Sequence, residues 1–70
     1  MNEQLSNRLR EERSRLGLTQ ADLATWVGVS RKTINTVENG VFIPSTVLAL
    51  RLARALGTSV EALFQLPAQR

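Results

Sequence analysis

The stretch that most constrains this chain is residues 17–40, because it predicts two short helices joined by a tight turn. The first helix is expected to begin after Thr19, which can cap it together with Asp22 three residues further on. Gly28 can adopt the left-handed conformation that ends a helix and turns the chain sharply. Ser30 can then cap the second helix. Two capped helices around one glycine leave few ways to arrange this segment.

The second of these helices opens with two cations, Arg31 and Lys32. Positive charge in a first helical turn opposes the helix dipole, at a cost of roughly a few tenths of a kcal/mol. A polyanion bound at that helix end would offset this cost. A helix, a turn containing glycine and a second helix that enters a groove form the helix-turn-helix motif. We therefore predict a DNA-binding module.

A helical wheel divides the residues of this second helix into two faces. Ile34 and Val37 define the inner face at 100° per residue. The other face and its flanks are polar and contain no acid: Arg31, Lys32, Thr33, Asn35, Thr36 and Asn39. Arginine and lysine donate to guanine, asparagine pairs with adenine, and threonine can touch thymine. An ordinary solvated face is the alternative interpretation, but the preceding capped helix, the glycine turn and the missing acids favour DNA.

Glu38 falls on the inner face, where a lone carboxylate would be costly. Arg13 lies four residues after Leu9, on the apolar side of the first predicted helix. We infer a structural Arg13–Glu38 ion pair between the first and third helices. Removing one partner of such a pair costs about 3–5 kcal/mol when the pair is buried.

The start of helix 20–27 is a predicted phosphate site. The first backbone amides of a helix have no partner within it and can bind an anion. Thr19 and Gln20 stand beside those amides, Thr19 chiefly as a cap and Gln20 as a DNA contact. Asn39, at the end of the next helix, is expected to lie near a second stretch of phosphates.

The whole chain of 70 residues predicts one all-α domain. Five helices can be placed, and no segment alternates long enough to predict a strand. We expect a compact five-helix bundle with these approximate helix ranges: 3–16, 20–27, 31–39, 45–56 and 60–66.

Composition argues against several classes of function. The chain has no cysteine and no histidine, so it lacks thiolate ligands, disulfides and the commonest general base. We expect that the protein is not an enzyme and that it has neither a metal site nor a cofactor. No apolar run approaches the ~18 residues of a membrane span. A cytoplasmic, nucleoid-associated protein without a membrane partner is therefore expected. The net charge of +3 is too small to be strong evidence for a polyanionic partner.

The sequence resembles the Cro/phage-repressor type of helix-turn-helix regulator, the Xre family with its lambda-repressor-like domain. The resemblance runs from Leu9 to about Leu66 and rests on six segments in order: GLTQADLA, VGVSRKTI, VENG, Pro44-Ser45, LARALGTS and VEALF. It implies a five-helix bundle that binds double-stranded operator DNA, commonly as a homodimer. By position, it places base reading on Arg31, Lys32 and Thr36. It also places phosphate contacts on Gln20, Thr33 and Asn39, and the structural ion pair on Arg13 and Glu38.

The sequence departs from the family pattern at three positions. Glu12 and Thr46 stand where aliphatic residues are usual. Val41 stands where lysine or arginine often touches the DNA backbone, so the loop after the third helix is expected to contribute less electrostatic affinity.

A homodimer on a near-palindromic site is expected, because one recognition helix contacts too few bases to single out a site. Its two recognition helices should lie about 34 Å apart, one turn of B-DNA. The apolar residues expected at the dimer interface are Leu63, Phe64 and Leu66.

Two alternatives remain open. In the first, the chain is an antitoxin-like or other protein-interaction module. In the second, it is the N-terminal DNA-binding part of a longer ligand-sensing regulator. An apolar contact patch would consist of Phe42, Ile43, Phe64 and Leu66, although the interpretation we favour is that these residues complete the core. Trp26 is expected to be half-buried.

Overall fold

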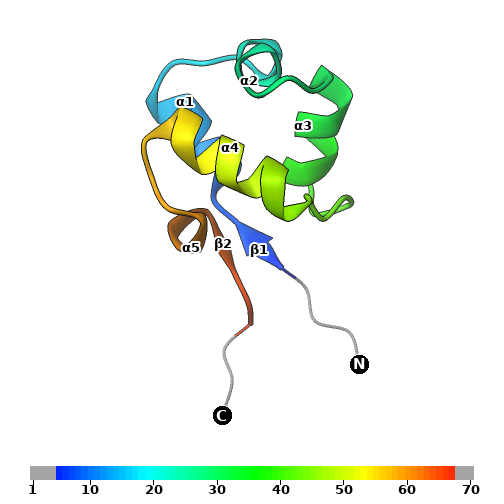
Figure 1. The fold of residues 1–70 in the computed structure, drawn as a ribbon, viewed down its shortest axis with the longest axis vertical. Helices are drawn as coiled ribbons and strands as arrows, with labels where there is room; N and C mark the ends of the chain where they lie inside the picture. The colour runs from blue at the N-terminus through cyan, green and yellow to red at the C-terminus, as the bar shows by residue number, and fades with distance from the viewer. Residues whose placement is uncertain (1–4, 68–70) are drawn as a thin grey trace.

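Residues 5–67 are described by a computed structural model, which contains five helices and a two-stranded sheet (Figure 1). The helices are α1 (Leu9–Arg15), α2 (Gln20–Val27), α3 (Arg31–Glu38), α4 (Thr46–Leu56) and α5 (Val60–Leu63). The strands are β1 (Ser6–Asn7) and β2 (Phe64–Gln65). Within the described range, no helix has the length and apolar content needed to cross a membrane.

Side-chain caps and glycines set the ends of α2 and α3. The Thr19 hydroxyl accepts a hydrogen bond from the Asp22 amide, and the Asp22 carboxylate accepts one from the Thr19 amide, both at 3.0 Å. Gly28 closes α2 with a φ of 78°, a left-handed conformation that disfavours other residues. The Ser30 hydroxyl accepts from the Thr33 amide at the start of α3. These ends agree with the sequence prediction, except that α3 stops one residue earlier, at Glu38.

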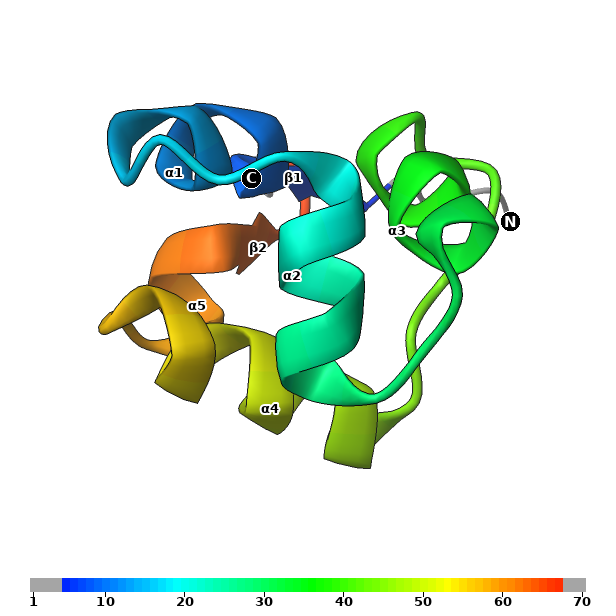
Figure 2. The same ribbon diagram turned by 90° about the horizontal axis from the view of Figure 1, so that it is seen from above.

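Apolar side chains from all five helices meet in one core. The largest buried side chains include one from each helix: Leu9, Leu23, Ile34, Leu52 and Leu63. From above, α2 and α3 lie side by side, with α4 beneath them (Figure 2). This packing holds α3 along one side of the molecule, where its outward residues remain exposed.

The predicted first helix, residues 3–16, is wrong at its start. Residues 3 and 4 lie outside the described part of the chain, Ser6–Asn7 is a strand, and α1 begins only at Leu9. The Asn7 side chain accepts from the Leu9 amide and donates to the carbonyl of Val37, both at 3.0 Å. These side-chain bonds offer the backbone an alternative to the helix.

The predicted fifth helix, residues 60–66, is too long. It ends at Leu63, and Phe64–Gln65 pairs antiparallel with β1 (Figure 1), Ser6 opposite Gln65 and Asn7 opposite Phe64. The Arg8 amide donates to the Leu63 carbonyl at 2.9 Å. That long-range bond pulls the chain away from helical geometry where α5 stops.

Several apolar residues are more exposed than the sequence suggested. Trp26 is 59% exposed instead of half-buried. Phe42, Ile43 and Leu66 are exposed and do not complete the core, whereas Phe64 packs against it. Surfaces of this kind are available for contact with another molecule.

Candidate nucleic-acid interface

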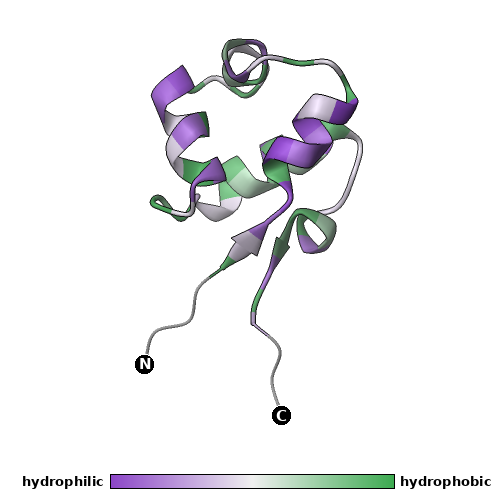
Figure 3. Cartoon of the chain, turned by 180° about the vertical axis from the view of Figure 1, so that it is seen from behind, coloured by the Kyte–Doolittle hydropathy of each residue, from purple (hydrophilic) through white to green (hydrophobic). Residues whose placement is uncertain are grey.

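The two faces of α3 differ as the helical wheel predicted. Ile34 and Val37 are fully buried against the core. The residues of the outward face are exposed or partly exposed: Arg31, Lys32, Thr33, Asn35 and Thr36. Seen from behind, α3 is largely purple, the colour of hydrophilic residues (Figure 3). The fold thus presents a polar surface from a helix held by its opposite side.

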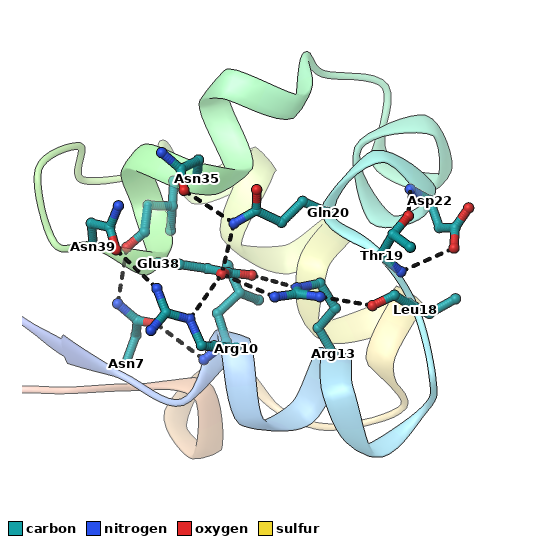
Figure 4. A network of polar contacts seen from close by, with 12 residues as sticks. Asn7, Arg10, Arg13, Leu18, Thr19, Gln20, Asp22, Asn35, Glu38 and Asn39 are labelled. Carbon is teal, nitrogen blue, oxygen red and sulfur yellow. Dashed lines mark hydrogen bonds and ion pairs between the residues drawn. The ribbon is translucent and has the colours of Figure 1, made fainter.

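The structure brings together Arg13 and Glu38, the pair expected to connect the first and third helices (Figure 4). The Arg13 Nε lies 2.6 Å from one Glu38 oxygen, and its Nη2 lies 3.3 Å from the other. The Glu38 side chain is 0% exposed. Arg13 also donates to the carbonyl of Leu18 at 2.8 Å, so this guanidinium joins α1, α3 and the segment before α2.

Two further residues contact Glu38, and neither contact was predicted from the sequence. The Arg10 Nε lies 3.4 Å from the carboxylate, and the Gln20 amide nitrogen lies 3.0 Å from it (Figure 4). A signal for Arg10 was present, since it lies three residues before Arg13 and thus on the same face of a helix. Glu38 therefore receives hydrogen bonds from three side chains.

The pKa of Glu38 reflects two opposing effects. Burial alone would raise it, because the charged form is poorly solvated. Hydrogen bonds from Arg13, Gln20 and Arg10, together with the charge of Arg13, outweigh burial and hold the pKa below its ordinary value. Glu38 is consequently ionised at neutral pH and fixes the guanidinium groups around it.

Gln20 has less freedom to bind DNA than its position suggested. Its amide nitrogen donates to both Asn35 Oδ1 and Glu38 Oε1, which uses both of its hydrogens. The carboxylate can only accept, so it fixes the orientation of the Gln20 amide. The Gln20 side chain is therefore left with an oxygen, which cannot donate to a phosphate.

Thr19 is likewise engaged within the protein. Its hydroxyl caps α2, and the carboxylate of Asp22 stands at the same helix end. Hydrogen bonds from the backbone and side chain of Thr19 lower the pKa of Asp22 and outweigh its slight desolvation. A negative charge thus occupies part of the predicted phosphate site.

Asn39, which follows the last residue of α3, is held by a side chain of α1. Its Oδ1 accepts from Arg10 Nη2 at 2.9 Å. This bond leaves the Asn39 amide hydrogens available and places the cationic Arg10, which is more than half exposed, beside them. Arg10 and Asn39 together form a donor-rich site, of which only Asn39 was predicted from the sequence.

The three predicted base-reading residues differ in how they are held. Neither Arg31 nor Lys32 forms a salt bridge within residues 5–67, and both are exposed. Thr36 is partly buried, and its hydroxyl donates to the Thr33 carbonyl at 2.9 Å. The face thus combines two unpaired cations with a threonine of fixed orientation.

The predicted dimer residues do not form one exposed patch. Leu63 is fully buried in the core of the monomer, so its assignment to a dimer surface is wrong. Phe64 is partly buried against that core, and Leu66 is 60% exposed. Of these three residues, Leu66 and the free side of Phe64 remain available to a second copy.

Comparison with known proteins gives consistent results for sequence and fold. A family model for a helix-turn-helix domain matches residues 4–66. An uncharacterised HTH-type transcriptional regulator of Methanothermobacter thermautotrophicus is 53% identical over 57 residues, which make up 80% of this chain and 83% of that protein. The regulator YgzD of Bacillus subtilis is 37% identical over 62 residues, or 89% of this chain and 94% of that protein.

Two solved structures are similar over most of the chain. The restriction-modification controller protein C.AhdI from Aeromonas hydrophila has a TM-score of 0.74 and 40% identity, and the match covers 79% of this chain and 83% of that one. Hydroxypropylphosphonic acid epoxidase from S. wedmorenis has a TM-score of 0.71 and 31% identity. That match covers 77% of this chain but only 29% of the epoxidase.

Proposed function

The chain belongs to the Xre-type helix-turn-helix regulators, and on that premise we propose that it is a sequence-specific transcriptional regulator that reads the major groove with α3. The observation that carries this proposal is the outward face of α3. Arg31 and Lys32 are exposed there without an acidic partner in the described range. Their donors match guanine O6 and N7, and the adjacent Thr36 can contact a neighbouring base.

Contacts to phosphates would set the position of α3 in the groove. The strongest candidates are Arg10 and the Asn39 amide, which lie together at the C-terminal end of α3. Thr33 and Asn35 flank the base-reading residues. At the start of α2, the backbone would contribute more than the Gln20 and Thr19 side chains, because both side chains already have partners within the protein.

We propose that the regulator acts as a homodimer on a near-palindromic operator. One helix with three base-reading side chains specifies too few base pairs, and a second copy doubles the site. An apolar surface is supplied by Leu66 and by the exposed side of Phe64, the first residue of β2. A symmetric dimer requires that this surface be self-complementary.

A protein-interaction module is the second candidate function. It is favoured by the side chains of Trp26 and Ile43, which are 59% and 67% exposed within the described chain. Catalysis is not part of either proposal, because the match to the epoxidase leaves most of that enzyme outside the shared region.

Selection of bound fragments from random DNA is the experiment that tests the DNA-binding proposal. We expect one enriched near-palindromic site, bound with an affinity that falls steeply as salt is added. Each neutralised phosphate contributes about −0.9 to the slope of log affinity against log salt. Arg31→Ala and Lys32→Ala should weaken binding to the selected site, whereas Arg54→Ala, an exposed change on α4, should not. No enriched site and a flat salt dependence would instead favour the protein-interaction module.

The homodimer has its own test. Leu66→Glu should shift the oligomer to monomer in light scattering across a concentration series, with and without the selected DNA. Leu66 is preferable to Phe64 because it is exposed, so the change leaves the core intact. One protein per site at saturation would contradict the homodimer.

A further inference from the structure

The backbone fixes Val41 and Phe42 to the C-terminal end of the recognition helix. Their amides both donate to the carbonyl of Thr36, at 2.9 and 3.2 Å. Gly40, with a φ of 75°, makes the turn that brings them back, and its amide donates to the Val37 carbonyl. Both apolar residues are therefore held at a set distance from Thr36.

A hollow of about 320 Å³ lies between this loop and α3. Its lining consists of Lys32, Thr33, Thr36, Val41 and Phe42. Val41 is 78% exposed, and Phe42 is also exposed. The hollow thus has an apolar wall formed by the loop and a polar wall formed by the helix, in continuity with the proposed base-reading face.

The chemistry of the lining restricts the occupant. A phosphate would have to lie against two apolar side chains and would lose hydration there. The edges of base pairs in the major groove present only one apolar group, the C5 methyl of thymine. Thymine also presents O4, an acceptor, beside that methyl. An apolar wall together with the donor of Lys32 fits both features of one base.

We propose that this hollow receives the C5 methyl of a thymine in each half-site, with Val41 and Phe42 as specificity-determining residues. The inference rests on the proposed function and deepens it. The Thr36 hydroxyl hydrogen is already donated to the Thr33 carbonyl, so Thr36 does not compete for O4 as a donor. Val41 stands where proteins of the resembled family often have a basic side chain. The apolar residue removes an attraction to phosphate and adds discrimination between bases.

Deoxyuridine substitution tests this directly, because uracil keeps O4 and base pairing and lacks only the methyl. Each thymine of the selected site is replaced in turn, and the affinity of the protein is measured by titration. We expect one position per half-site at which the replacement lowers affinity about fourfold, the effect of one buried methyl group. Val41→Ala should lower affinity for the thymine site and leave affinity for the uracil site unchanged. The discrimination at that position then falls, while the contribution of Phe42 remains.

Ile43→Ala is the matched control, since Ile43 is an exposed residue of the same loop and does not line the hollow. This variant should keep the full thymine preference. If Val41→Ala weakens both sites equally, the residue contacts sugar instead, and the proposal is overturned. An absence of any thymine-sensitive position, or unchanged discrimination in Val41→Ala, overturns it as well. These outcomes leave the proposed function standing, whereas failure to select any site would remove both.

Discussion

Helices α3 and α4 begin in the same way but are held in the fold by different forces. Ser30 and Ser45 each cap their helix by accepting from the amide three residues later. Of the eleven residues of α4, five are buried; of the eight residues of α3, only two are. Apolar burial therefore anchors α4 far more strongly than it anchors α3.

Directional polar bonds hold α3 in place, where less apolar surface is buried than in α4. Glu38 at its C-terminal end is buried among Arg13, Arg10 and Gln20, and the Val37 carbonyl accepts from Asn7. Such bonds fix orientation with little buried area. A helix that must keep most of its surface free for a ligand can be positioned in this way, whereas a helix that only supports the fold can bury its side chains.

The largest effect is expected from Leu52→Ala in α4. Leu52 is fully buried, and loss of a buried leucine side chain costs about 2–5 kcal/mol of unfolding free energy. Leu50→Ala, an exposed change on the same helix, should cost much less. Urea unfolding of the two variants measures the contrast. Equal losses would show that α4 is not held by burial.

Arg13→Ala tests the anchoring of α3. We expect a loss of about 3 kcal/mol, at the low end of the range for a broken buried ion pair, since Arg10 and Gln20 still contact Glu38. Arg15→Ala is the matched control, because Arg15 pairs with Glu12 on the surface and such pairs contribute about 0–1 kcal/mol. The Arg13→Ala and Glu38→Ala changes combined should cost less than their sum. Additive losses would mean that the pair does not act as a unit.

Acid should weaken the anchor of α3 through Glu38. Because folding lowers its pKa, the ionised carboxylate stabilises the protein above the ordinary glutamate pKa of about 4.3. That contribution is lost as the pH falls through the lower pKa of the folded state. Thermal melts from neutral pH to pH 3 should therefore show a steeper loss in the parent than in Glu38→Gln. Asp22 is present in both proteins, so its own titration cancels in the comparison. Parallel pH profiles would contradict the role of the ionised carboxylate.

The smallest effect on stability is expected at the free face of α3. Arg31→Ala should change the unfolding free energy by no more than about 0.5 kcal/mol, because the side chain is exposed and unpaired in the described structure. The same variant should bind the selected DNA more weakly. A large loss of stability would mean that this face also supports the fold.

The sequence predicted the helix-turn-helix segment closely, because its ends depend on local chemistry. Thr19, Gly28 and Ser30 act on residues within a few positions of themselves. Helical spacing likewise placed Arg13 and Glu38 on facing sides. Information of this kind is available from one sequence without knowledge of the tertiary structure.

The errors concern residues whose state depends on distant parts of the chain. A strand of two residues has no measurable alternation, so β1 and β2 left no pattern to detect. Leu63 was expected at a dimer interface, but packing against the rest of the core buries it completely. The engagement of Gln20 with Glu38 requires α2 and α3 to be in place first.

The small sheet has a consequence for the order of folding. Ser6 and Gln65 are 59 residues apart, so their pairing must close nearly the whole described chain into a loop. Contacts between α2 and α3 join residues much closer in sequence and cost less entropy to form. We therefore expect the helix-turn-helix to assemble early and the strands to pair last and to open first. Hydrogen exchange at the amides that bond across this sheet should therefore be faster than at the hydrogen-bonded amides of α3.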